Sequence, residues 1–174
     1  MWHWFRDYRR KKIRAVPFPG IWERHIQNNI QYYQHLNNSE KKCLQDLIQI
    51  FIAEKSWLGC NGLELTDEIR VMIAAHACLM ILALPNDYYR NVESIYVYPT
   101  TIFSPESSIG FFEVSTTPVQ GAMPILGEAH HRGPVILVWD VVNKETRHPE
   151  HGHNVVYHEF AHKLDMLDGS ADGT

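Results

Sequence analysis

The segment from Val71 to Leu84 is apolar on every side of a helix, and it constrains the fold more than any other part of the sequence. Thr66 can cap such a helix, Asp67 and Glu68 suit its first turn, and Pro85 ends it. An apolar run of about 14 residues is shorter than the roughly 20 that a membrane-spanning helix needs. A helix that is hydrophobic all round must then be buried by other elements. The sequence therefore predicts a central core helix and no membrane span. His76, which lies inside it, is predicted to be a hydrogen-bonded core residue and not a metal ligand.

Segments before and after this helix in the sequence can pack against it and bury it. Residues 21–36 carry apolar side chains at near-helical spacing, and a second amphipathic helix is predicted from Ser39, as N-cap, to about Trp57. After Pro85, residues 94–98, 110–114 and 134–142 are typical of strands, the last most strongly because it is mostly β-branched and aromatic. Helices followed by strands predict an α+β fold.

The length and charge of the chain limit its organisation. A chain of 174 residues with 45% hydrophobic content can bury one core, so we expect one domain over residues 21–174 after a basic aromatic tail over residues 1–20. Residues 1–14 carry a net charge of +5, which leaves −9 for the rest. This asymmetry disfavours a nucleic-acid-binding domain.

The tail allows two interpretations. Trp2, Trp4, Phe5 and Tyr8 alternate with basic residues, which is typical of an arm that binds a membrane surface or a polyanion. The favoured interpretation is a solvated tail whose aromatic side chains pack back on the domain, because so short a run has no sustained amphipathic period. No role is assigned to it.

Cysteine usage indicates the compartment. Cys43, Cys60 and Cys78 form no C-x-x-C pair, and an odd, sparse set is typical of reduced thiols in an intracellular protein. The basic N-terminus leads into Pro17 and Pro19 instead of the apolar stretch of a signal peptide. A cytoplasmic location is expected.

The chemistry is carried by His158-Glu159-Phe160-Ala161-His162. Asn154 can cap a helix that runs to about Leu167. On that helix His158 and His162 differ by roughly 40° around the axis, so both rings can reach one Zn²⁺ ion. Glu159 lies on the adjoining side, where it can hydrogen-bond a water molecule. The context of a cappable, apolar helix after a strand favours a metal site over an accidental pattern.

The pattern predicts a metallohydrolase. Zinc lowers the pKa of a bound water from near 16 toward about 7, and Glu159 can remove its proton as the water attacks a carbonyl carbon. The same carboxyl can deliver the proton to the departing amine. The candidate site is therefore His158 and His162 as metal ligands and Glu159 as catalytic base.

A catalytic zinc normally takes a third protein ligand. Asp165 could hydrogen-bond a zinc ligand and orient it. Asp168 lies at the third-ligand spacing of related patterns but replaces their histidine, so direct ligation by Asp168 is a less favoured alternative. A ligand beyond residue 174 is favoured. His151 and His153 are interpreted as part of a solvated loop. His130 and His131 are ambiguous, and both groups are left out of the site.

The run from Gly152 to Gly169 resembles the zinc-dependent peptidase family of Mlc titration factor A, and residues 132–139 and 62–66 are similar to other segments of that family. The resemblance implies a zincin-like fold, similar to the catalytic domain of anthrax lethal factor. It also implies a cytoplasmic zinc metallopeptidase with aminopeptidase-like activity on peptide substrates. In the family the two histidines are ligands, the glutamate is the base, and a glutamate on a later helix is the third ligand, so the chain is expected to be a C-terminally truncated member.

Two functions remain open at this point. The first is peptide hydrolysis by a water that Glu159 activates. The alternative is a binding protein that sequesters a transcriptional repressor of the Mlc type, with a structural metal or a site that is inactive in this fragment. The strand over residues 135–142 could pair with an extended substrate, but core packing on both faces is favoured.

Overall fold

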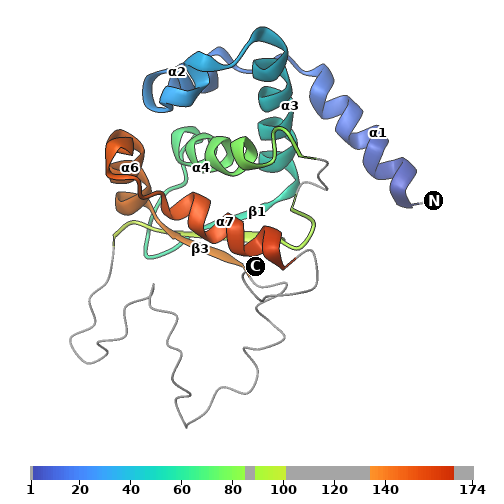
Figure 1. Ribbon diagram of the computed structural model, residues 1–174. Coiled ribbons are helices and arrows are strands. Elements are labelled where there is room, and N and C mark those ends of the chain that lie inside the picture. Colours follow the sequence, from blue (N-terminus) through green and yellow to red (C-terminus); the bar gives the residue numbers. More distant parts are fainter. Residues whose placement is uncertain (1, 85–88, 101–133, 167–174) are drawn as a thin grey trace, which may run out of the picture.

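The computed structural model describes residues 2–84, 89–100 and 134–166, and Figure 1 shows helices packed over one face of a small sheet. The predicted strand at 110–114 and residues His130, His131 and Asp168 lie outside these ranges. The elements, in chain order, are α1 (Trp2–Ala15), α2 (Gly20–Asn29), η1 (Gln31–His35), α3 (Asn38–Glu54), β1 (Ser56–Gly59), α4 (Asp67–Met80), β2 (Ser94–Tyr98), β3 (Val135–Val138), α6 (Trp139–Arg147), η2 (Pro149–His151) and α7 (Val155–Asp165). This arrangement confirms an α+β fold.

Helix α4 lies at the centre of the core, as predicted. The Thr66 hydroxyl accepts a hydrogen bond from the Ile69 backbone N–H at 3.3 Å, which caps the helix as expected. Every residue from Val71 to Cys78 is buried, and α2, α3 and α7 pack around the helix. The helix ends at Met80, and residues 81–84 form turns before Pro85.

The described strands form one parallel sheet in the order β1-β2-β3. Strand β2 matches its prediction. The sequence does not predict β1, because Trp57 continues the apolar pattern of the preceding helix. In the register of the sheet, Trp57 pairs with Ile95, which pairs with Val135.

Strand β3 is shorter than predicted, because the chain turns into α6 at Trp139. In this part of the chain Val142 and Thr146 are buried while Asp140 and Lys144 are exposed, which is helical periodicity. The expected burial of the strand on both faces is also wrong, since Ile136 is 38% exposed. Among the described strands, β3 lies at one edge.

The boundaries of α3 differ from the prediction. Asn37 caps this helix, not Ser39: its side-chain oxygen accepts from the Glu40 N–H at 3.0 Å, and the Glu40 carboxylate accepts from the Asn37 N–H at 2.8 Å. The Ser39 hydroxyl donates to the Asn37 side chain and so supports the cap. The helix ends at Glu54, three residues before Trp57. Residues 21–36 form α2 and the 3₁₀ helix η1 instead of one helix.

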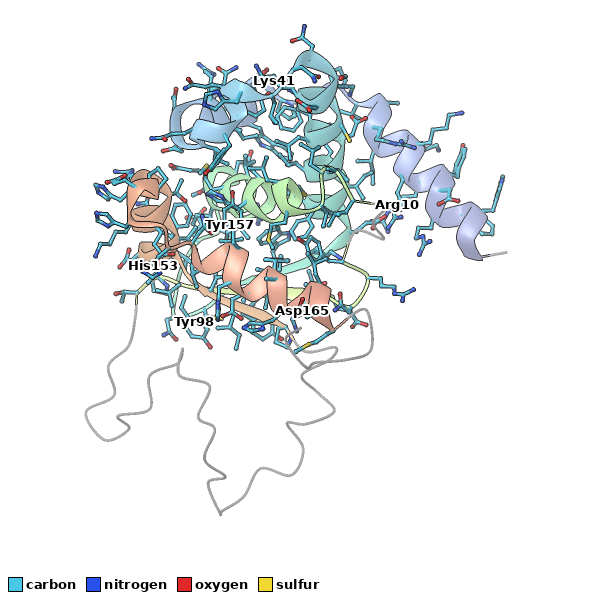
Figure 2. The ribbon with its side chains drawn as sticks, viewed as in Figure 1. Arg10, Lys41, Tyr98, His153, Tyr157 and Asp165 are labelled. Atoms are coloured by element: carbon cyan, nitrogen blue, oxygen red, sulfur yellow. The ribbon has the colours of Figure 1, made fainter. Side chains whose placement is uncertain are left out.

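The solvated tail predicted at the N-terminus is instead the helix α1, which packs on α3. Figure 2 shows Arg10 between the two helices, where its guanidinium donates to both carboxylate oxygens of Glu54 at 2.7 Å. Trp4, Phe5 and Tyr8 are 65%, 60% and 50% exposed, so the expectation that they pack back on the domain is wrong. Within the described ranges, no helix combines the length and hydropathy that crossing a membrane requires.

An aromatic cluster holds α7 against the core. Phe160 is fully buried, and its ring centroid lies 5.7 Å from that of Phe51 on α3 and 4.8 Å from that of Tyr89. The Tyr89 hydroxyl donates to the Ala77 carbonyl of α4 at 2.8 Å. Three elements distant in sequence are thereby joined by one cluster.

Replacing Phe160 with alanine should lower the free energy of unfolding by about 3–5 kcal/mol, because it removes a fully buried ring and leaves a cavity. Urea denaturation monitored by circular dichroism measures this loss. The matched control is Phe5→Ala at an exposed position, which should change stability by less than about 0.5 kcal/mol. Equal stabilities of the two variants would contradict the role given to the cluster.

Candidate metal centre

Helix α7 begins where the sequence predicts. The Asn154 side-chain oxygen accepts from the Tyr157 N–H at 3.0 Å, and the Glu145 carboxylate accepts from the Val155 N–H at 2.6 Å. These bonds satisfy backbone donors of the first turn. The face that includes Val156 and Phe160 is buried, which directs His158 and His162 to the exposed side.

The two histidines lie at ligand spacing. Their Nε2 atoms are 3.2 Å apart, and their ring planes are nearly perpendicular with centroids 4.6 Å apart. Two nitrogen ligands at 2.0–2.1 Å from a tetrahedral zinc are about 3.3 Å apart. The separation of the His158 and His162 Nε2 atoms is therefore compatible with two ligand positions around one zinc ion.

Glu159 lies on the adjoining side of α7 and is half-buried. Its charge acts on Lys163, one turn later: burial lowers the pKa of the Lys163 ammonium, and the Glu159 carboxylate opposes this shift. Lys163 is further held through its carbonyl, which accepts from the Asn91 side chain at 2.7 Å. The carboxylate of Glu159 thus stands beside the histidine pair, next to a buried cation.

Other candidate ligands are less well placed. Asp165 is exposed at the end of α7, as Figure 2 shows, and no hydrogen bond joins it to either histidine. In the part of the chain that the structure describes, no group of three or more His, Cys, Asp or Glu side chains gathers to hold a metal ion. Of the predicted ligands, the structure brings together His158 and His162.

A histidine-rich segment lies just before α7. His148, His151 and His153 line a pocket of about 320 Å³ together with residues of α6. The segment is more ordered than its sequence indicated, because it forms the 3₁₀ helix η2, and the rings of His148 and His151 stack with centroids 5.5 Å apart. The imidazole of His148 hydrogen-bonds the Glu150 carboxylate at 3.1 Å. All three histidines are exposed.

His76 is a buried core residue, as predicted, but its partners could not be found from the sequence. Its Nε2 lies 3.0 Å from the Thr146 hydroxyl of α6, and its Nδ1 lies 3.3 Å from the Asn154 amide nitrogen. Because the Asn154 oxygen faces the Tyr157 N–H, the amide N–H donates to Nδ1. The proton of neutral His76 is therefore on Nε2, which donates to Thr146. Burial lowers the pKa of His76 from 6.5 to about 4.

This network connects the central helix α4 to α7. Asn154 caps α7, and its side-chain amide is itself held by His76 of α4. The rings of Tyr157 and His76 are nearly perpendicular, with centroids 5.1 Å apart. The sequence near either residue does not predict this hydrogen bond, because His76 and Asn154 are 78 residues apart.

The chain is similar to proteins of one family. The chain matches the family described as glucose-regulated metallo-peptidase M90 over residues 4–174. An uncharacterized protein of Synechocystis sp. is 35% identical over 177 residues, which cover 98% of this chain and 61% of that protein. Mlc titration factor A of Klebsiella pneumoniae and that of Salmonella typhi are each 30% identical over 138 residues, or 78% of this chain and 49% of those proteins. The chain thus spans about half to three-fifths of the length of these relatives.

The buried His76 should make folding sensitive to acid. The unfolded chain binds a proton at this residue near pH 6.5 and the folded protein only near pH 4, so unfolding is favoured as the pH falls through this interval. The contribution of neutral His76 to the free energy of unfolding is fully present above pH 6.5. It falls by about 3 kcal/mol as the pH drops to 4. Urea titrations at several pH values measure the slope.

The His76→Gln variant should remove this step while keeping a polar side chain between Thr146 and Asn154. The matched control is His35→Gln, at an exposed position, which should retain the wild-type slope. Identical pH profiles for the wild type and His76→Gln would contradict the assignment.

Proposed function

This chain belongs to the glucose-regulated metallo-peptidase M90 family, and we propose that it carries the zinc-binding helix of an aminopeptidase-like metallopeptidase. The observation that supports this most directly is the 3.2 Å separation of the His158 and His162 Nε2 atoms. The proposal extends to a zincin-like fold for residues 21–174, with peptides as substrates. The activity of the complete protein is part of the same proposal, since its relatives are longer than this chain.

In this proposal His158 and His162 hold a zinc ion through Nε2. A bound zinc would polarise the scissile carbonyl and make water acidic enough to react at neutral pH. The residues of the chain determine where this occurs: the buried Val156 and Phe160 fix α7, and the Asn154 cap holds its first turn. The imidazoles project from the opposite, exposed face, where a peptide can approach.

Glu159 is the proposed general base. Its carboxylate accepts a proton from the attacking water as a C–O bond forms at the peptide carbonyl, and it returns that proton to the nitrogen as the C–N bond breaks. Water is consumed, a carboxylic acid and an amine are released, and no covalent intermediate with the protein is needed.

A cytoplasmic location belongs to the same proposal. Cys43, Cys60 and Cys78 are all free thiols, and Cys78 is buried against the core. Free thiols are common where the cell keeps cysteine reduced.

The second candidate is a regulator-binding protein. Several relatives bear the name Mlc titration factor A, so a transcriptional repressor of the Mlc type is a proposed partner. In that case a metal at His158 and His162 would stabilise α7, and Glu159 would have no catalytic task.

The Glu159→Gln variant separates these functions. If Glu159 is the base, hydrolysis of short peptides with free amino termini should fall by about 10²–10⁴-fold, because a neutral amide cannot accept the proton. Zinc content and repressor binding should stay at wild-type values. The matched control is Glu93→Gln at an exposed position, which should retain full activity. Peptide hydrolysis that is unchanged in Glu159→Gln would sink the peptidase proposal and favour the binding protein.

Zinc binding has its own test. Replacing either His158 or His162 with alanine should weaken zinc affinity by more than the 10–100-fold that loss of an outer-shell partner typically costs. Competition with a chromophoric chelator measures the affinity, and circular dichroism verifies that the fold is intact. The control, His35→Ala, should bind zinc as the wild type does. Retained affinity in both ligand variants would remove the metal site from α7.

A further inference from the structure

Helix α1 presents an aromatic and basic face to solvent. Trp4 and Tyr8 are one turn apart, and their rings stack with centroids 5.8 Å apart and planes inclined by 11°. Phe5 contacts the Trp4 ring edge-on at 5.1 Å. All three side chains are at least half exposed, although they are large and apolar. Such a cluster on an outer surface is a typical mark of an interaction site.

The opposite face of α1 fixes the orientation of this cluster. Arg10 is buried and paired with Glu54 of α3, and Arg9 donates to the Ala53 carbonyl at 3.2 Å. Ile13 lies three residues after Arg10 and is partly buried. At 100° per residue, Trp4, Tyr8 and Lys11 lie on the side away from Arg10 and Ile13. The aromatic cluster therefore points away from the body of the protein.

Basic residues surround the aromatic cluster. Lys11, Lys12 and Arg14 are exposed, and the Lys12 ammonium lies 4.7 Å from the centroid of the Tyr8 ring. Residues 1–14 carry a net charge of +5, while the remainder of the chain carries −9. Positive charge is thus concentrated on α1, the same helix that exposes Trp4, Phe5 and Tyr8.

We propose that α1 binds the surface of an anionic phospholipid membrane, with Trp4, Phe5 and Tyr8 at the headgroup boundary and the lysines against the lipid phosphates. Aromatic side chains with a flat, amphipathic shape favour this boundary, and each Lys or Arg near an anionic surface adds attraction. Nucleic acid is the alternative occupant, and the comparison of vesicles with a DNA oligonucleotide separates the two.

The position of α1 suits contact with a flat surface. In Figure 1 the N-terminal end of α1 projects past the other described elements, at the edge of the molecule. None of the described helices can span a bilayer, so the contact would be peripheral. Binding of this kind is reversible and depends on lipid charge and ionic strength.

Sedimentation with lipid vesicles tests the proposal. The 174-residue chain should bind vesicles of phosphatidylcholine with phosphatidylserine at least about tenfold more tightly than vesicles of phosphatidylcholine alone, and less tightly as salt rises. Charge reversal by Lys11→Glu with Lys12→Glu should weaken binding to the anionic vesicles by about tenfold or more. The matched control reverses the neighbouring lysines Lys41 and Lys42 on α3, which changes the net charge equally and should leave binding near the wild-type value.

A second pair of variants tests the aromatic cluster. Trp4→Ala with Tyr8→Ala should weaken vesicle binding and reduce the blue shift of tryptophan fluorescence on binding, whereas Tyr32→Ala, at an exposed position on η1, should do neither. Circular dichroism verifies that α1 stays folded. The proposal is overturned if anionic vesicles do not bind or if both lysine pairs behave alike. It is also overturned if a DNA oligonucleotide binds as tightly as the vesicles while the aromatic variants bind both like the wild type.

Discussion

Burial of α4 is the constraint on which the rest of the structure depends. This helix is apolar around its whole circumference, so every neighbouring element must cover part of it. Helices α2, α3 and α7 do so, and strands β1 and β2 flank α4 in the sequence and pair in parallel. The crossover from β1 through α4 to β2 places the helix on one face of the sheet. The position of α7, which carries His158 and His162, is then a consequence, since α7 is one of the elements that bury α4.

The candidate metal centre is exposed, but its geometry is determined by buried groups. Phe160 anchors the middle of α7 in an aromatic cluster with Phe51 and Tyr89. His76 holds the Asn154 side chain that caps the start of the helix. These contacts restrict both the tilt and the rotation of α7, so they determine the side of the molecule on which the two imidazoles lie. A rigid support for exposed ligands favours metal binding, because less conformational entropy is lost when the ion binds.

Helix α1 reverses the usual distribution of residues on a surface helix. Its inward face holds the ion pair of Arg10 with Glu54, while Trp4, Phe5 and Tyr8 face solvent. A helix of a purely structural kind would bury its aromatic rings and expose its arginines, because that arrangement removes more apolar surface from water. The observed arrangement favours a role for the outer face in binding, and it places this role on a different element from the one that carries the histidine pair.

The sequence by itself determined the features that depend on local geometry. The i, i+4 spacing of His158 and His162, the caps at Thr66 and Asn154, and the apolar circumference of α4 all follow from helix periodicity and short-range hydrogen bonds. Only the tertiary structure decided three other matters. Strand β1 exists because β2 pairs with it, and the apolar run after Val138 becomes a helix because Val142 and Thr146 meet the core. The partners of His76 come from residues about 70 positions away. Long-range contacts of this kind leave no local periodicity in the sequence, so no reading of neighbouring residues could have predicted them.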